Sequence, residues 1–108
     1  MRSVKSVMRK LGNTGGKKGF FFTITAIELL MEQETRCLNL SRDVYPEVAK
    51  RHQVNVSCVE RDIRTMVEDC WLHGNRNLFH EIAGYELDHR PTVKEFLEML
   101  HGYLLENE

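Results

Sequence analysis

Four polar residues with the spacing of one helix face are the side chains best suited to recognition chemistry: Ser57, Glu60, Arg61 and Arg64. They share one side of a helix that is predicted to run from Val56 to about Leu72. An arginine can donate two hydrogen bonds to O6 and N7 of guanine, and a glutamate can accept one from N4 of cytosine. Because phosphate binding alone would not need Glu60, this mixture predicts a surface that reads DNA bases in the major groove.

The opposite side of the same predicted helix is apolar and is expected to face the core. It consists of Val59, Ile63, Met66, Val67 and Cys70, with Trp71 at its margin. Helical spacing turns Trp71 toward the body of the domain, so we predict a core residue there rather than a stacking platform. Taken alone, an amphipathic helix with a polar outer face is most often only solvated, so the interpretation depends on what precedes it.

The preceding segment has the pattern of a helix followed by a tight turn. Pro46 suits the first position of a helix that runs to about residue 52, because its missing N–H costs nothing there. Four residues have the spacing of a helix-turn-helix. Ala49 is the small residue where the two helices would cross, Val54 is the buried residue of the turn, and Val59 and Ile63 anchor the second helix. Asn55 is the predicted N-cap of the second helix, and Gln53 stands where many such motifs have glycine. The combination favours DNA reading over a plain solvated face.

Four further helices are predicted from apolar spacing and from residues that start or stop helices. Three of them cover about residues 4–11, 20–32 and 75–83, and Gly12 and Gly84 end the first and the third. The fourth follows a capping box formed by Thr92 and Glu95. The segment 20–25 would suit a strand by propensity, but no partner strand is apparent and a lone strand cannot satisfy its backbone. The apolar stripe of the last helix would serve either the core or a dimer contact. We therefore predict an all-α, compact single domain over residues 1–108, with about six helices that include a helix-turn-helix.

Composition excludes several classes of protein. Hydrophobic residues make up 42% and charged residues 29% of the 108 residues, as in soluble globular domains. The longest apolar stretch is too short to span a bilayer and no secretory signal is apparent, so we expect a cytoplasmic protein that does not bind a membrane. Cys37, Cys58 and Cys70 have no metal-like spacing and are expected to be reduced thiols. The five scattered histidines predict no metal, and nothing predicts a cofactor or enzymatic activity.

The net charge of -1 conceals an uneven distribution along the chain. The first 27 residues include six basic residues and no acidic one, so they contribute +6, whereas the remainder contributes -7. The N-terminal end is therefore a candidate surface for DNA phosphates, although a basic tail that merely aids solubility would have the same composition.

Several short motifs of this chain together resemble those of one protein family. They are Val44-Tyr45-Pro46-Glu47-Val48-Ala49-Lys50, Val59-Glu60-Arg61 followed by Ile63-Arg64, Trp71 with Gly74-Asn75, Gly84-Tyr85 and Pro91-Thr92. In this combination the chain resembles, over nearly its whole length, the C-terminal DNA-binding effector domain of the sporulation response regulator, the stage-zero sporulation protein A family. The resemblance implies a six-helix domain whose recognition helix binds short promoter boxes in double-stranded DNA, as a homodimer on tandem sites. RNA polymerase is implied as a further partner.

The same resemblance implies roles for individual residues. Those that would face bases are Ser57, Glu60, Arg61 and Arg64. Lys18 and Gly19 match a pair that lies close to the phosphate backbone in the family. The remaining predicted phosphate contacts are Lys50, Arg51, Asn55 and Thr65.

The chain departs from the family pattern in three ways. Family members carry a receiver domain upstream, whereas this chain begins a few residues before the matching part, which predicts an excised fragment or a free-standing paralogue. Cys58 stands where the family commonly has a basic residue, and Asp62 replaces a small residue. Loss of a cation and gain of an anion weaken the attraction to phosphate. The alternative function is therefore that of a stand-alone paralogue, a protein-interaction module with weak or no DNA binding.

Overall fold

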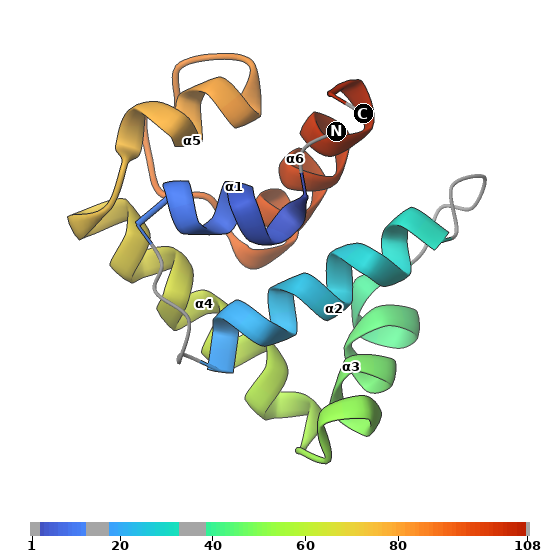
Figure 1. The fold of residues 1–108 in the computed structure, drawn as a ribbon. Helices are drawn as coiled ribbons and strands as arrows, with labels where there is room; N and C mark the ends of the chain where they lie inside the picture. Colours follow the sequence, from blue (N-terminus) through green and yellow to red (C-terminus); the bar gives the residue numbers. More distant parts are fainter. Residues whose placement is uncertain (1–2, 13–17, 33–38, 108) are drawn as a thin grey trace.

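Six α-helices and one π-helical turn make up the part of the chain that the computed structural model describes, residues 3–12, 18–32 and 39–107 (Figure 1). The elements are α1 (Val4–Lys10), α2 (Lys18–Glu32), η1 (Leu40–Val44), α3 (Tyr45–His52), α4 (Val56–His73), α5 (Arg76–Ala83) and α6 (Val93–Glu106). No strand occurs within these ranges, and the predicted all-α class with six helices is confirmed.

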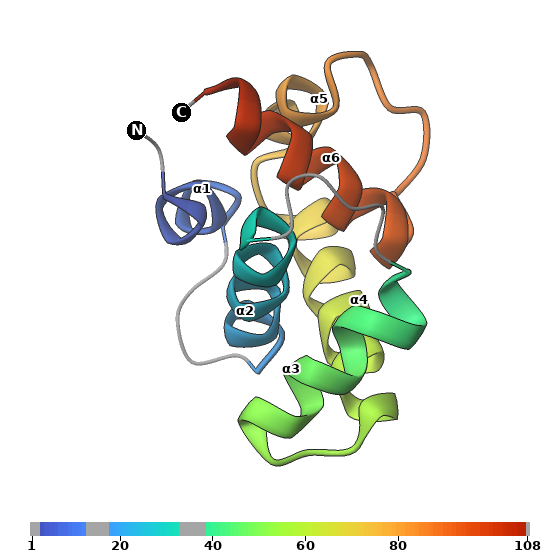
Figure 2. The ribbon, with the colours of Figure 1, turned by 90° about the vertical axis from the view of Figure 1, so that its right-hand side faces the viewer.

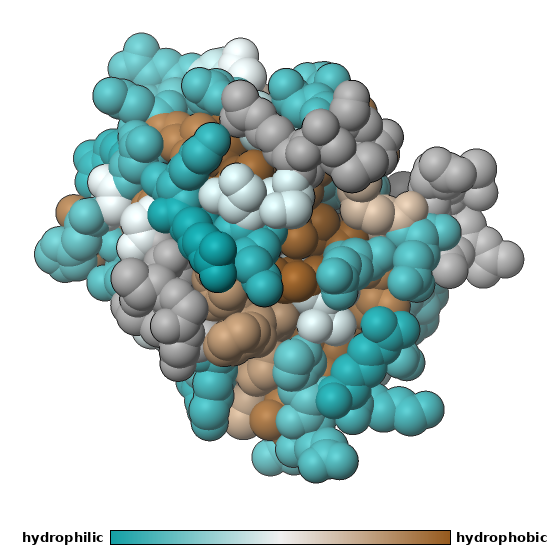
Figure 3. All heavy atoms as spheres, in the orientation of Figure 1, coloured by the Kyte–Doolittle hydropathy of each residue, from teal (hydrophilic) through white to brown (hydrophobic). Residues whose placement is uncertain are grey.

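Helices α2 and α4 pack against each other at the centre of the domain, and the other helices surround this pair (Figures 1 and 2). α6 contacts α2, α4 and α5, whereas α3 contacts α2 and the N-terminal half of α4. Fully buried side chains from five helices fill the core: Met8, Phe20, Ile27, Ile63, Phe79, Phe96, Leu97 and Leu100. On the face shown in Figure 3, hydrophilic side chains surround apolar atoms that emerge along α2.

The segment with strand-like propensity is helical, as predicted. Phe20 and Phe22 are buried in the core at 1% and 3% exposure, whereas Phe21 between them is 45% exposed. The gain from burying two aromatic side chains in the core, with the ring of Phe22 5.0 Å from that of His52 on α3, outweighs the weak β-propensity of the segment. The helix begins at Lys18, two residues before the predicted start.

The predicted helix ends are confirmed in their main features. Gly12 and Gly84 both have positive φ, at 100° and 85°, where a side chain would be strained. The capping box is formed: Thr92 Oγ1 accepts from the N–H of Glu95 at 3.1 Å, and Glu95 Oε1 accepts from the N–H of Thr92 at 2.9 Å. The latter contact lowers the pKa of the Glu95 carboxyl. The apolar stripe of α6 is buried inside the domain.

The π-helical turn η1 was not predicted. The side chain of Asn39 accepts from the N–H of Arg42 at 2.9 Å, and the carboxylate of Asp43 accepts from the N–H of Asn39 at 2.9 Å. Because this turn continues directly into α3, Pro46 is the second helical residue and not the first as predicted. The fixed φ of proline still suits a position near the start of α3.

Two glycines bring neighbouring elements within backbone contact of α4. A Cβ atom added to Gly19 would lie 2.3 Å from the carbonyl oxygen of Asp62, and one added to Gly74 would lie 2.1 Å from the carbonyl oxygen of Leu11. The N–H of Asn75 donates to the same Leu11 oxygen at 3.0 Å. α4 is therefore held at its middle by α2 and at its C-terminal end by the segment after α1.

Candidate nucleic-acid interface

The turn between α3 and α4 is closed by backbone hydrogen bonds. Gln53 adopts the left-handed conformation, with φ 57° and ψ 48°, and its N–H donates to the carbonyl of Lys50 at 3.3 Å. The N–H of Val54 donates to the carbonyl of Ala49 at 3.0 Å. Ala49 is buried where the helices cross, as predicted, but Val54 is only half-buried, because it packs at the edge of the core.

Asn55 occupies the predicted N-cap position of α4, but its side chain does not cap the helix. Its backbone is extended, with φ -74° and ψ 149°, and its carbonyl accepts from the N–H of Cys58 at 3.0 Å. The exposed carboxamide makes no hydrogen bond to the first turn. The prediction of a capping side chain is therefore wrong, and this amide can instead donate to a group outside the protein.

The predicted core face of α4 is confirmed. Its members are 2% exposed or less: Val59, Ile63, Met66, Val67 and Cys70. Trp71 is half-buried, with its ring 5.4 Å from that of Phe79 in an edge-to-face arrangement and the guanidinium of Arg76 4.3 Å from its ring centroid. As predicted, Trp71 is a packing residue at the margin of the core.

The four predicted base-reading residues lie on the outer side of α4. Ser57, Arg61 and Arg64 are exposed, and Glu60 is half-buried. Arg64 and Glu60, one turn apart, form an ion pair. Burial, and secondarily the charge of Glu60, raise the pKa of Tyr45 to about 12, so this tyrosine stays neutral beside the carboxylate.

The guanidinium of Arg61 contacts two neighbours on the same helix. Its Nε lies 3.4 Å from Oδ1 of Asp62, and its Nη2 donates to Sγ of Cys58 at 3.4 Å. The Asp62 contact is the main cause that raises the pKa of Arg61, so its positive charge is permanent. The two positions at which the chain departs from the family pattern thus both contact the same arginine.

Three of the predicted phosphate contacts lie together beside α4. Lys18, Gly19 and Thr65 line a shallow hollow of about 250 Å³, together with Asp62 and Met66. Lys18 and Thr65 are exposed, whereas Gly19 is buried against α4 and presents only backbone. Asp62 also lines this hollow, and its negative charge makes the hollow less attractive to an anion than Lys18 alone would.

Lys50 and Arg51 lie apart from this hollow, in the last turn of α3. Both are exposed, and Arg51 Nε donates to Oε2 of Glu47 at 3.0 Å. For Lys50, no ion pair occurs within the described residues. The predicted phosphate contacts therefore fall into two groups, one in the hollow between the start of α2 and α4 and one in the last turn of α3.

The basic N-terminal stretch does not form one surface. Lys18 reaches the hollow beside α4, whereas Lys5, Arg9 and Lys10 lie on α1, whose end contacts the opposite, C-terminal end of α4. Arg2 and Lys17 lie outside the described residues. Only part of the predicted phosphate-facing end therefore adjoins the recognition face.

Two long-range contacts to the helix-turn-helix were not predicted. Arg90, in the segment between α5 and α6, forms a 2.9 Å ion pair with Glu68 on the outer side of α4. His52, at the end of α3, shares a 2.8 Å hydrogen bond with Thr25 of α2. These residues carry no sequence motif, so no local signal could have found them.

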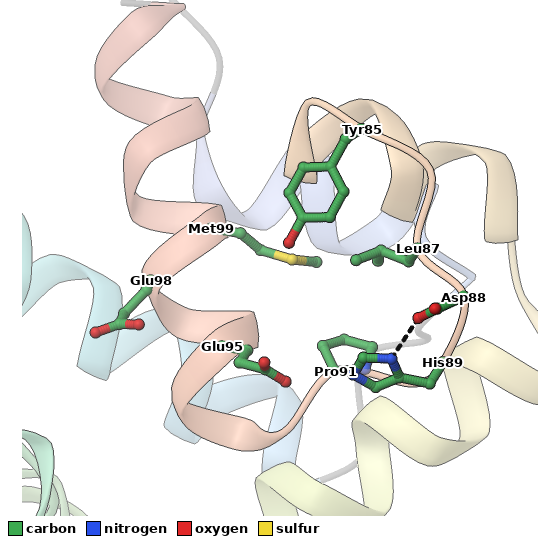
Figure 4. A pocket seen from close by; sticks show the side chains of 8 residues that line it. All are labelled: Tyr85, Leu87, Asp88, His89, Pro91, Glu95, Glu98 and Met99. Atoms are coloured by element: carbon green, nitrogen blue, oxygen red, sulfur yellow. Dashed lines mark hydrogen bonds and ion pairs between the residues drawn. The ribbon is translucent and has the colours of Figure 1, made fainter.

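A second hollow, of about 330 Å³, lies between α6 and the segment that follows α5 (Figure 4). Tyr85, Leu87, Pro91 and Met99 give it an apolar lining, and three carboxylates stand at its margin: Asp88, Glu95 and Glu98. The Nδ1 of His80 accepts from the N–H of Leu87 at 2.8 Å and fixes the segment. His80 and His52 thus both have hydrogen-bond partners within the domain.

Among the described residues, no three His, Cys, Asp or Glu side chains are grouped as a metal ion would require. No described helix has the length and apolar character needed to cross a membrane. Cys58 and Cys70 take part in no disulfide there, and Cys37 lies outside the described residues.

A short turn between two packed helices, the second of which exposes arginines along its outer side, defines the helix-turn-helix class of DNA-binding domain. The sequence model of the family described as the sporulation initiation factor Spo0A C terminal matches residues 4–104, and the chain belongs to this family. Its members are DNA-binding regulatory domains of sporulation control. The family resemblance recognised in the sequence motifs is thereby confirmed.

Proposed function

We propose that this domain is a sequence-specific transcription regulator that reads promoter boxes with α4 in the major groove. The observation that carries the proposal is the outer side of α4, where Ser57, Arg61 and Arg64 are exposed together near the N-terminal half of the helix. The N-terminal residues of a recognition helix are those that approach base edges. The regulator acts in the cytoplasm, where its DNA targets are.

The arginines supply the base contacts. Arg64 is paired with Glu60 and Arg61 with Asp62, but every one of these side chains retains access to solvent. Exposed ion pairs contribute only about 0–1 kcal/mol each, so exchanging the Arg64–Glu60 pair for a guanine contact costs little. Arg61 can keep the contact of its Nε with Asp62 while its two terminal nitrogens donate to a base. Each guanidinium can then donate two hydrogen bonds to O6 and N7 of a guanine.

Two groups of phosphate contacts set the position of α4 in the groove. The first consists of Lys18, the backbone of Gly19, and Thr65; the second consists of Lys50, Arg51 and the uncapped amide of Asn55. Such contacts position the protein without reading sequence. Binding as a homodimer on tandem boxes, with contact to RNA polymerase, belongs to the same proposal.

Fluorescence anisotropy with two labelled duplexes of equal length tests the proposal, one carrying a sporulation-type promoter box and one its scrambled sequence. We expect the box to bind at least about a thousandfold more tightly, with log affinity falling linearly in log salt. Equal, weak binding of both duplexes by the folded protein would contradict base reading.

A second candidate function is that of a protein-interaction module with weak DNA binding. It is favoured by the negative charge of Asp62, which lines the same hollow as Lys18, and by the apolar hollow against α6 (Figure 4). This candidate predicts salt-independent association with a receiver-bearing homologue in the absence of DNA, whereas phosphate contact is strongly salt-dependent.

A further inference from the structure

Val56, the first residue of α4, exposes a branched apolar side chain at the tip of the candidate interface. It is 43% exposed, between the exposed polar residues Asn55 and Ser57. The other large apolar side chains exposed in the described part of the chain lie on other helices, in a loop or at the far end of α4: Phe21, Leu72, Tyr85 and Leu105.

Packing accounts for only part of the Val56 side chain. Helical spacing places it three and seven residues before the core residues Val59 and Ile63, at the open end of the core face, where 43% of its surface stays exposed. The exposed part of this apolar side chain can therefore contact a group outside the protein.

We propose that Val56 contacts the C5-methyl group of a thymine in the major groove. The inference rests on the proposed function, because it requires α4 to enter that groove. Residues at the N-terminus of a recognition helix meet base edges. Among the four bases, thymine alone presents an apolar group there, and burying that methyl group against a valine removes apolar surface of both from water.

This contact gives the interface a second kind of chemistry. Ser57, Arg61 and Arg64 recognise donors and acceptors, whereas Val56 recognises a methyl group that carries neither. A 5-methylcytosine at the same position carries its methyl group in the same place, so it is accepted in preference to unmodified cytosine.

The test begins with a duplex selected by the wild-type domain from a random-sequence library. Each thymine of that duplex is then replaced singly by deoxyuridine, which removes the methyl group and leaves base pairing unchanged. We expect one thymine per recognition helix at which the replacement weakens binding by about three- to tenfold, as expected for burial of one methyl contact. For the Val56→Ala variant the thymine and deoxyuridine duplexes bind equally well.

Leu72→Ala is the matched control, because Leu72 is a 65% exposed apolar residue at the other end of the same helix. This variant must retain the full thymine preference. A wild-type domain that binds its selected duplex but tolerates every deoxyuridine replacement overturns the inference and leaves the proposed function intact. The same holds if Val56→Ala keeps the preference. Failure of the library to yield any preferred sequence overturns the proposed function itself and the inference with it.

Discussion

The Nε of Arg61 lies 3.4 Å from the carboxylate of Asp62, the residue that follows it on α4. This contact holds the guanidinium along the helix before DNA arrives, so less side-chain entropy is lost on binding. Asp62 also lines the hollow that contains Lys18 and Thr65, so its negative charge opposes the attraction of this hollow for phosphate. Asp62 therefore has two opposed effects: it orders a base-reading arginine and it weakens general attraction to DNA.

Asp62→Ala should separate these two effects. We expect affinity for a scrambled duplex to rise by about two- to fivefold at low salt, because an anion is removed within a Debye length of phosphate. The ratio of box to scrambled affinity should fall, because Arg61 is no longer held. Anisotropy titrations with both duplexes measure the two quantities.

Glu106→Ala provides the control for this variant, since it removes the same charge from the end of α6, far from the turn that precedes α4 (Figure 1). It should leave the ratio of affinities unchanged. A rise in the ratio for Asp62→Ala would show that the carboxylate only interferes with recognition.

Gln53→Gly should stabilise the domain. Gln53 has φ 57°, a conformation that costs a residue with a side chain about 1 kcal/mol and glycine almost nothing. We expect an increase of that size in the free energy of unfolding, measured by urea denaturation. Gln53→Ala retains a Cβ atom and should show no comparable gain. Equal stability of the glycine and alanine variants would mean that the turn relaxes without strain.

Gly19→Ala should destabilise the contact between α2 and α4. The new Cβ would lie 2.3 Å from the carbonyl oxygen of Asp62, which is backbone and cannot move without shifting α4. We expect a loss of at least about 2 kcal/mol in unfolding free energy. Gly102→Ala, in the interior of α6 with nothing within 4 Å of the added atom, should instead add about 0.5–1 kcal/mol. Similar effects of the two variants would contradict the close helix packing.

Stability should decrease as pH falls below about 6.5, the ordinary pKa of histidine. The Nε2 of His101 is buried and has no hydrogen-bond partner within the described residues, and burial lowers the pKa of this histidine. The unfolded chain therefore binds a proton at His101 more readily than the folded domain does. The contribution of neutral His101 to folding stability is complete above pH 6.5 and is lost as pH falls toward the folded-state pKa.

Urea denaturation at pH 7.5 and 5.5 measures this dependence, and His101→Leu should reduce it. His73 is exposed at the C-terminal end of α4 and serves as the control, so His73→Leu should leave the pH dependence unchanged. An unchanged pH dependence in His101→Leu would assign the effect to other groups.

Most of the fold could be predicted from the sequence, because its helices are delimited by local signals. Gly84 and the Thr92–Glu95 pair act within one or two turns of themselves, and both are found where expected. The turn η1 escaped prediction because it depends on side-chain contacts of Asn39 and Asp43 rather than on apolar spacing. The residue type and position of Asn55 also predicted a capping side chain, but this side chain makes no hydrogen bond to the first turn of α4.

The outer face of α4 was predictable from helical period alone, but its electrostatic setting was not. Glu68 pairs with Arg90, 22 residues further along the chain, and such a contact leaves no periodic trace. The meeting of Lys18 with Asp62 likewise depends on how α2 crosses α4. Sequence spacing specifies which residues share a face, whereas the packing of helices decides which faces meet.

The measurement that tests base reading most directly compares Arg61→Ala with Lys50→Ala on the box and the scrambled duplex. We predict that Arg61→Ala loses about 1–3 kcal/mol of binding free energy on the box and far less on the scrambled duplex, so that preference for the box falls. Lys50→Ala should weaken both duplexes alike and reduce the salt slope by about one. Equal losses on both duplexes for both variants would contradict the claim that α4 reads bases.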